Sequence, residues 1–389
     1  MEINKKYAKW GIGILLSPVA LFIVLTLLLY IPAVQKWAVD LATEYASDHT
    51  GLDIRIDRVR LAFPLDLSVG GVNVVQQNDS MPQVKDTVAN VHDIAVSVQL
   101  MPLFKGQVNI DRLDLNKVKM NTTNFIHEAR VKGTVGQLSL RSHGIDLHKQ
   151  SLRVDEARLA DARVSVELSD TVKKDTTKTK NLWKIAVDRL DIANTDVTVH
   201  MPGDTLRVQA MLDKASARHG LFDLGKEEYS LKSFDWQGGF VKYDNRFEPR
   251  LKGLDTNHIL LSDVNLAIDS MFYHAPRLDL AMRQLAFREK SGISVTRLNG
   301  HIALDSTRVI LPKLSLSTPE SSLTAAVTLD MNAFSDKNPG KLQASIDASI
   351  GKQDIMRFMG GMPTEFIRRW PNQPLSIKGS MRGNIRRID

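Results

Sequence analysis

The amino-acid sequence predicts a mostly β protein that follows one N-terminal transmembrane helix and contains few other helices. Three observations predict this fold class. An uncharged apolar segment of membrane-spanning length lies near the N-terminus. Beyond residue 51, apolar residues recur with a period of two instead of 3.6. A short strand-like unit with a central aspartate then occurs four times.

The N-terminal segment predicts a single-pass membrane anchor, covering residues 1–33. No residue from Trp10 to Gln35 is charged, and about 20 apolar residues suffice to cross a hydrocarbon core of about 30 Å. Three lysines precede the span, and Trp10 and Tyr30 lie near its ends, so we expect a cytoplasmic N-terminus and the bulk of the chain on the other side of the membrane. The predicted anchor residues are Ile12, Leu16, Leu21, Val24, Leu28 and Ile31.

A cleaved signal peptide is the alternative interpretation of this segment. Its apolar region usually has about 7 to 15 residues and ends in a small-x-small cleavage site. Here the apolar run is longer, and the stretch from Tyr30 to Gln35 lacks a good site of that kind. We therefore expect the span to remain in the mature protein.

Residues 34–51 predict a short amphipathic helix that ends at Thr50-Gly51. The helix could lie on the membrane or cap the first sheet, and capping is the more common role. The residues at helical spacing are Val34, Trp37, Ala38, Leu41 and Tyr45.

Residues 52–350 predict a repetitive β region. The recurring unit reads apolar-x-apolar-Asp-(Arg or Glu)-apolar-x-apolar, and the alternation slips by one residue at its aspartate. Since an uncorrected slip would turn the apolar side chains to the other face, each slip predicts a bulge or tight bend. Calcium ligation would need several donors within one short loop, whereas these aspartates are spread along the chain. The units are Ile54 to Leu61, Val108 to Leu115, Leu152 to Leu159 and Ile185 to Ile192, with Asp57, Asp111, Asp155 and Asp188.

The unequal spacing of the units, 54, 44 and 33 residues, disfavours a strict solenoid and favours variable hairpins on one continuous sheet. The polar segment Ser169 to Asn181 predicts an exposed loop between paired strands. The stretch Ile293 to Ile310 continues the alternation. Residues 351–389 predict short helices at Gln353 to Met359 and Thr364 to Trp370, and then the start of a further β segment.

The sequence offers no recognisable catalytic or metal-binding motif. It has no phosphate-binding glycine loop, no nucleophile elbow and no H-E-x-x-H pattern, and its ten histidines are dispersed. It has no cysteine, so disulfides and thiolate metal sites are excluded. With 51 Lys and Arg against 44 Asp and Glu in no dense block, nucleic-acid binding is disfavoured. We expect no enzyme, no cofactor and no metal site.

Three passages resemble the TamB and AsmA-like superfamily, whose architecture is related to that of bridge-like lipid transfer proteins. The first is the order of anchor, amphipathic helix and Thr50-Gly51 before the strand and Phe63-Pro64-Leu65. The second runs from Ala95 to Leu115, with a strand, a short turn around Met101 to Gly106 and the recurring unit. The third is the recurrence of that unit.

The resemblance implies that the anchor lies in a bacterial inner membrane and that the bulk of the chain is periplasmic. It also implies an elongated, twisted antiparallel β-sheet folded into an apolar groove, a β-taco, that carries phospholipids between inner and outer membranes. The alternative function is a scaffold for outer-membrane protein translocation and assembly by β-augmentation. TamB proteins are much longer, so this chain is expected to be an N-terminal fragment or a shorter AsmA-like member, and an Omp85-type barrel would be a partner only through a C-terminal part not present here.

Taken alone, the period-two alternation also fits a solid β-sandwich and favours it over a groove. The order of anchor and repeats favours the groove. The expected groove-lining residues are Ile54, Ile56, Val108, Ile110, Leu113, Leu115, Val154, Leu159, Ile185, Val187, Leu190 and Ile192.

Overall fold

The computed structural model describes residues 31–388 except 51, 63–65, 78–82, 84, 100–109, 123–128, 147–149, 169–181, 202, 204, 251, 334, 336, 361–362 and 385–386. The predicted anchor residues Ile12, Leu16, Leu21, Val24 and Leu28 lie outside this part. Ile31 immediately precedes the first described helix and is 44% exposed. In the described part, no helix has the length and apolar character needed to cross a bilayer.

The described residues form one 18-stranded sheet. Its strands are β1 (Asp53–Ala62), β2 (Asp66–Gln77), β3 (Lys85–Val98), β4 (Ile110–Asn121), β5 (Ala129–Asp146), β6 (Ser151–Leu168), β7 (Lys184–Met201), β8 (Leu206–Asp223), β9 (Glu228–Leu231), β10 (Ser233–Asp244), β11 (His258–His274), β12 (Arg277–Glu289), β13 (Ser294–Leu304), β14 (Arg308–Ser317), β15 (Ser322–Asp330), β16 (Leu342–Ile350), β17 (Leu375–Asn384) and β18 (Arg387–Ile388).

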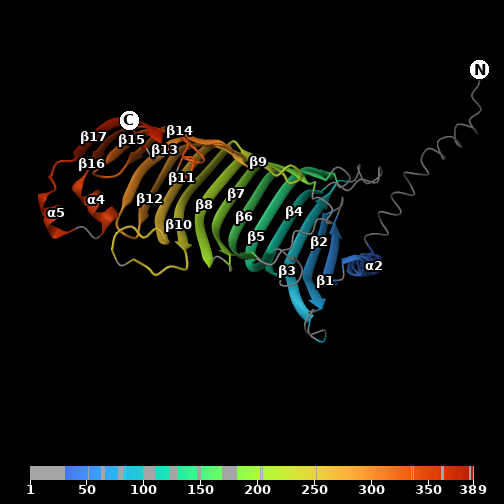
Figure 1. The fold of residues 1–389 in the computed structure, drawn as a ribbon. Helices are drawn as coiled ribbons and strands as arrows, with labels where there is room; N and C mark the ends of the chain where they lie inside the picture. Colours follow the sequence, from blue (N-terminus) through green and yellow to red (C-terminus); the bar gives the residue numbers. More distant parts are fainter. Residues whose placement is uncertain are drawn as a thin grey trace, which may run out of the picture.

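Successive strands are neighbours, so the sheet grows along the chain from β1 to β18 (Figure 1). Strand β9 pairs with both β8 and β11, alongside β10. Every described pairing is antiparallel except that of β6 with β7, which is parallel. The prediction of one continuous antiparallel sheet is therefore confirmed, with this one exception. The predicted loop Ser169 to Asn181 lies outside the described residues, and it joins two parallel strands.

Helix α2 (Pro32–Thr50) lies beside β1, at one end of the elongated sheet (Figure 1). The Ser47 hydroxyl accepts a hydrogen bond from the Ile54 amide at 3.3 Å. The helix thus covers the otherwise open edge strand, which sheets commonly protect in this way. Trp37, which the helical spacing places in the apolar stripe, is 65% exposed, so part of that stripe remains accessible.

At the other end of the sheet, α4 (Lys352–Met359) and α5 (Thr364–Arg369) confirm the two predicted short helices. Strand β17 then pairs with β16 and extends the same sheet. The predicted unbroken alternation from Ile293 to Ile310 was wrong. The Asp305 carboxylate accepts hydrogen bonds from the Thr307 and Arg308 amides at 2.7 and 3.1 Å, and this turn separates β13 from β14.

A line of unpaired positions crosses strands β1 to β8 and β10, and we call it the seam. At each step, two neighbouring strands both leave one residue out of the ladder, so register is kept while the backbone kinks. Several seam residues adopt left-handed backbone conformations, with φ between 44° and 77°. The seam comprises Asp57, Gly71, His92, Lys117, Gly136, Asp161, Asn194, Asp213 and Gly238.

The aspartates of the recurring unit interrupt the ladder, as predicted. Asp57 lies on the seam. Asp111 is left out where β3 and β4 shift register. Asp155 and Asp188 are left out together between β6 and β7. The last three therefore mark a second line of bends, which lies nearer to the other long edge of the sheet.

Candidate functional site

One unbroken row of apolar residues crosses the sheet from β1 to β17, and we call it the central row. Each member is the direct cross-strand partner of the next. Cross-strand partners project to the same face of a sheet, so the row is continuous on one side. Its members are Val59, Val69, Ile94, Leu115, Leu138, Leu159, Ile192, Ala215, Trp236, Leu266, Leu285, Leu298, Leu316, Leu323, Ala348 and Ile377.

A second row, which we call the flanking row, runs beside the central row. On each of strands β2 to β8, its member lies two residues from the central-row member of the same strand. It contains only apolar residues and glycine. Its members are Leu67, Val96, Leu113, Leu140, Ala157, Leu190, Ala217, Phe234, Ile268, Met282, Gly300, Leu314, Ala325, Ile346 and Gly379.

The seam keeps a third set of residues on this same face. Val72, Val91, Val118, Val135 and Ala162 follow the seam on the side opposite to the central row, and they are buried in one cluster. Central-row residues such as Leu115, Leu138 and Leu159 pack against that cluster. The extra residue at each seam position therefore cancels the phase slip of the sequence, and the apolar face continues across the bend.

The structure brings most of the predicted lining residues together on this face. Leu115, Leu159 and Ile192 belong to the central row, and Leu113 and Leu190 to the flanking row. The remaining described residues lie in short apolar cross-strand pairs. These pairs are Ile54 with Val74, Ile56 with Val72, Ile110 with Val98, Val154 with Val187, and Ile185 with Leu152. Val108 lies outside the described residues.

The side chains of the apolar face are mostly half-buried. Among the described residues, the largest side chains that are less than 2% exposed are Val264, Thr195 and Asp255, so no leucine, isoleucine or phenylalanine reaches that level. At the C-terminal end, Ile377 of the central row is 44% exposed. The face is therefore a continuous apolar surface that still contacts solvent.

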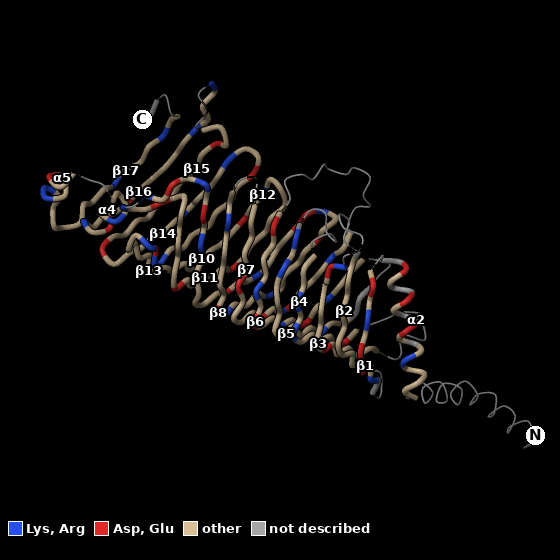
Figure 2. Tube along the Cα trace, turned by 90° about the horizontal axis from the view of Figure 1, so that it is seen from below, with Lys and Arg blue, Asp and Glu red and all other residues tan. Residues whose placement is uncertain are grey.

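Charged residues of both signs are distributed along the whole sheet (Figure 2). Many of them pair between or along strands. Arg283 contacts Asp235 at 2.8 Å and Asp269 at 3.2 Å, and Arg189 contacts Asp191 at 2.8 Å. His143 pairs with Asp155. In the part of the chain that the structure describes, no group of three or more His, Asp or Glu side chains could hold a metal ion.

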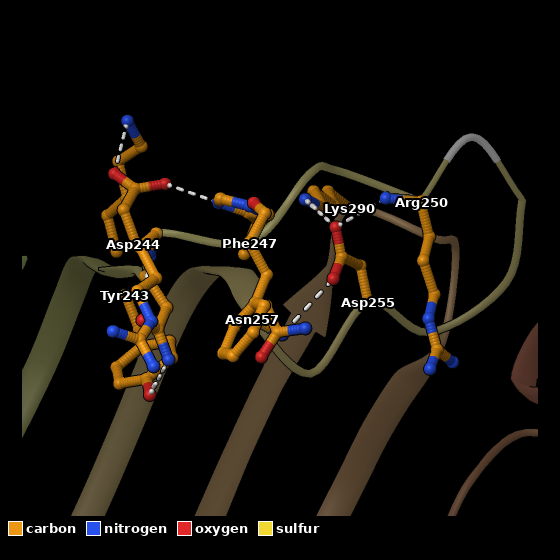
Figure 3. A network of polar contacts seen from close by, with 11 residues as sticks. Tyr243, Asp244, Phe247, Arg250, Asp255, Asn257 and Lys290 are labelled. Carbon is orange, nitrogen blue, oxygen red and sulfur yellow. Dashed lines mark hydrogen bonds and ion pairs between the residues drawn. The ribbon is translucent and has the colours of Figure 1, made fainter. Parts of the chain in front are cut away.

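A polar network fixes one long edge of the sheet near α4 (Figure 3). The Asp255 side chain is fully buried and accepts hydrogen bonds from the Arg250 and Asn257 amides at 3.0 and 3.1 Å. Lys290 lies 3.7 Å from the same carboxylate. Burial acts to raise the pKa of Asp255, but these two hydrogen bonds and the charges of Lys290 and His258 outweigh it and hold the pKa below its usual value.

The same loop is tied to α4, because the Leu254 amide donates a hydrogen bond to the Phe358 carbonyl at 3.2 Å. His258 links the loop back to its strands through Asp244 at 3.4 Å and the Phe247 carbonyl at 2.5 Å. The network therefore holds this edge of the sheet together.

Sequence reasoning missed the seam and most C-terminal members of the rows. A signal for the seam was present in β4, where Leu113 and Leu115 are followed by Val118 and Met120. Unbroken alternation would place the next apolar residues at positions 117 and 119, and both of these are lysines. The strand pairings that join the row members could not be inferred from any local stretch of sequence.

In comparisons with protein-family models and with curated proteins, the chain matches none.

Proposed function

We propose that this chain is an inner-membrane-anchored envelope protein of the TamB and AsmA-like kind, which carries phospholipids toward the outer membrane along its apolar face. The central row carries the proposal. Its 16 members, one on each of β1–β8 and β10–β17, extend over about 70 Å at the usual strand separation. The hydrocarbon of one lipid leaflet is about half of a 30 Å core, so several lipids could lie along the row in succession.

The half-buried state of the apolar face supports an open groove over a solid sandwich. In a sandwich, two inner faces interdigitate and exclude water from their large aliphatic side chains. Here the buried hydrophobic residues are mainly valine and alanine, and the row leucines remain partly exposed. An apolar ligand could therefore cover surface that the protein itself leaves accessible.

The free energy of burying acyl chains is compatible with a lipid conduit. Each buried methylene of an acyl chain contributes about 0.8 kcal/mol relative to water, so two chains are held without specific polar contacts. A bilayer offers the same chain a similarly apolar environment. Transfer between membrane and groove is therefore close to balanced, and lipids could leave as readily as they enter.

Aspartate substitutions on the apolar face test the proposal. In Leu159→Asp and Ile192→Asp, the carboxylate can stay hydrated in an open groove, so the full-length variants should fold and melt only slightly earlier. They should lose most of the phospholipid that co-purifies with the wild-type protein, measured by mass spectrometry. Arg158→Asp places the same charge on the opposite face and should retain the lipid, which makes it the matched control.

Two results would contradict the conduit. If the wild-type protein purified without bound phospholipid, the proposed cargo of the groove would be absent. Variants that unfold, as an unpaired charge in a solid core requires at a cost of several kcal/mol, would favour the sandwich.

A second candidate is the assembly scaffold, and one observation favours it. Strand β17 pairs with β18 at only two of its residues, Gly383 and Asn384, so in the described part most of its outer edge is unpaired. Leu375 on this strand is 40% exposed. Such an edge could accept a client strand by β-augmentation. Ser376→Pro would remove one backbone donor there, and it should weaken capture of outer-membrane clients without reducing bound lipid.

A further inference from the structure

A third row of apolar residues, which we call the rim row, runs along the long edge of the sheet that carries β9 (Figure 1). On β15, Leu329 of this row lies six residues from Leu323 of the central row, and the ladder to β16 is unbroken between them, so both project to the apolar face. Each member is the direct cross-strand partner of the next, so the whole row lies on that face. Its members are Leu152, Ile185, Phe222, Tyr229, Tyr273, Leu278, Leu304, Val309, Leu329 and Leu342.

Three consecutive members of the rim row are aromatic. The ring centroids of Phe222 and Tyr229 are 6.3 Å apart, and those of Tyr229 and Tyr273 are 6.2 Å apart in a stacked arrangement. Phe222 is 38% exposed and Tyr273 is 41% exposed. The three rings therefore form one accessible patch that combines an apolar body with two phenol hydroxyls.

Within the β region, tyrosine occurs only at this station of the sheet. The chain has six tyrosines, and those after residue 52 are Tyr229, Tyr243 and Tyr273, on β9, β10 and β11. Tyr243 lies at the opposite long edge, two residues from Val241, which packs against Trp236 of the central row, so it also faces the apolar side. The central and flanking rows contain no tyrosine.

The spacing of these tyrosines from the central row matches the length of an acyl chain. Tyr229 and Tyr243 are each seven residues from Trp236, and Tyr273 is seven residues from Leu266. Seven residues extend over at most about 23 Å in a strand, and bends shorten this distance. The hydrocarbon of one lipid leaflet is about 15 Å deep, so chains that reach inward from the rim row fit on the flanking and central rows.

We propose that Phe222, Tyr229 and Tyr273 form a site for the glycerol and ester region of a diacyl phospholipid. The acyl chains lie inward on the flanking and central rows, and the two tyrosine hydroxyls donate hydrogen bonds to ester or phosphate oxygens. This inference rests on the proposed function. It adds the orientation of the lipid and the site that sets its depth in the groove.

The chemistry of tyrosine suits such a boundary. Its ring packs in hydrocarbon while its hydroxyl reaches polar groups, as in the aromatic belts at membrane interfaces. In the part of the chain that the structure describes, Tyr229 and Tyr273 contact aromatic rings, and their hydroxyls have no hydrogen-bond partner.

The charged residues next to the site lie on the other face. Asp223, Glu228 and His274 are cross-strand partners at the strand ends, and they alternate with the aromatic residues. The tyrosine hydroxyls are therefore the polar groups that these strand ends present on the apolar face, and the headgroup extends past them into solvent.

Two photoreactive phosphatidylcholines test the site on the full-length protein. One carries a diazirine close to the glycerol, and the other carries it at the end of an acyl chain. Tandem mass spectrometry identifies the labelled residues. We expect the glycerol-side probe to label the vicinity of Tyr229 and Tyr273, and the chain-end probe to label the vicinity of Ile192 and Leu266.

The double variant Tyr229→Phe/Tyr273→Phe keeps both rings and removes only the hydroxyls. Its glycerol-side labelling at the rim row should fall about fivefold or more, because two hydrogen bonds are lost. Its chain-end labelling should be unchanged, which shows that the variant is folded and loaded with lipid. The matched control is Ser270→Ala, which removes a hydroxyl from β11 on the other face and should leave both labels unchanged.

Two outcomes would overturn the inference. They are unchanged glycerol-side labelling in the double variant, and glycerol-side labelling centred on the central row of the wild-type protein. If the chain-end probe still labels the central row in either case, the proposed function stands without this site. If neither probe labels the apolar face, the proposed function itself fails.

Discussion

The first eight strands and strands β11 to β17 bend the same sheet by different means. Between β1 and β8, each pair of neighbours leaves out one residue on both sides at the seam, so the ladder stays in register there. Register shifts in this region lie away from the seam, between β2 and β3, β3 and β4, and β5 and β6. Between β11 and β15 the two strands skip unequal numbers of residues and the register shifts. From β15 to β17 the ladder is uninterrupted. The shifts fall between Ser262 and Asn265, Met282 and Leu285, Gly300 and Ala303, and Leu311 and Leu314.

The comparison shows what the two regions preserve. Despite the shifts, Leu285 still pairs with Leu298, and Leu298 with Leu316. The central row therefore passes through regular and irregular ladders alike. This is expected if selection acts on a continuous apolar face and leaves the backbone free to bend in more than one way.

The largest expected effect comes from breaking the seam. Gly239 follows seam residue Gly238 and has a φ of 107°, and a β-carbon there would overlap the Met211 carbonyl oxygen. Gly239→Ala should therefore lower the free energy of unfolding by about 3 kcal/mol or more, because backbone atoms of β8 cannot yield. Chemical denaturation measures this change.

Gly379→Ala is the matched control in the C-terminal region. Nothing lies within 4 Å of its β-carbon position, so its effect should stay within about 0.5 kcal/mol. If both variants had equal stability, the seam would not be the rigid element that we describe.

A middle-sized effect is expected at the edge network of the C-terminal region. In Asp255→Asn, the side-chain oxygen can accept from only one of the two backbone N–H groups, and the side-chain NH₂ group faces the other. The substitution also removes the negative charge beside Lys290. The free energy of unfolding should fall by about 1–3 kcal/mol. Lys252→Asn, in the same loop but outside this network, serves as the control and should have little effect.

The pH dependence of this difference follows from the lowered pKa of Asp255. A carboxyl whose folded pKa is depressed stabilises the fold above its unfolded pKa of about 3.9, and that contribution is lost as pH falls through the folded value. The stability gap between wild type and Asp255→Asn should thus be constant from about pH 7 to pH 5 and shrink in stronger acid. A gap that widened on acidification would contradict the assigned ionisation state.

The sequence predicted what depends on neighbouring residues and missed what depends on strand pairing. Alternation and its slips are local, so the β region, the bends at Asp57 and Asp188 and the helix at residues 353–359 could be predicted. The parallel pairing of β6 with β7 depends on which strands meet, and no local pattern encodes it. Spacing also predicted the helix that ends at Thr50, whereas its position beside β1 was one of two alternatives that spacing left open.

The candidate site shows the same limit. Eleven of the twelve predicted lining residues are described, and they come from strands β1, β4, β6 and β7, where the repeated unit made the pattern visible. Trp236, Leu266 and Leu285 continue the row without any such unit, so only the register identifies them. The network at Asp255 was not predicted at all, because Arg250, Asn257 and Lys290 meet there only after the loop and β12 have packed.

The smallest effect on stability is expected at Asp53, which offers an exposed counterpart to Asp255 in the N-terminal region. Hydrogen bonds from Arg55 and Lys85 lower the pKa of this carboxyl to about 2. Because the group is exposed, solvent screens the pair, and Asp53→Asn should leave the melting temperature nearly unchanged.

The Asp53 carboxyl of the wild-type protein should nevertheless titrate near 2 by carbon-13 NMR. Arg55→Ala should move this pKa furthest back toward 3.8, and Lys85→Ala should move it less, following the order of their contributions. The pH dependence has the same direction as for Asp255. Any stabilisation by the Asp53 carboxylate is present above its unfolded pKa and disappears as pH falls through about 2. A wild-type titration near 3.8 would show that the pair does not form in solution, whereas a large loss of stability in Asp53→Asn would show that this edge of β1 is held as firmly as the loop around Asp255.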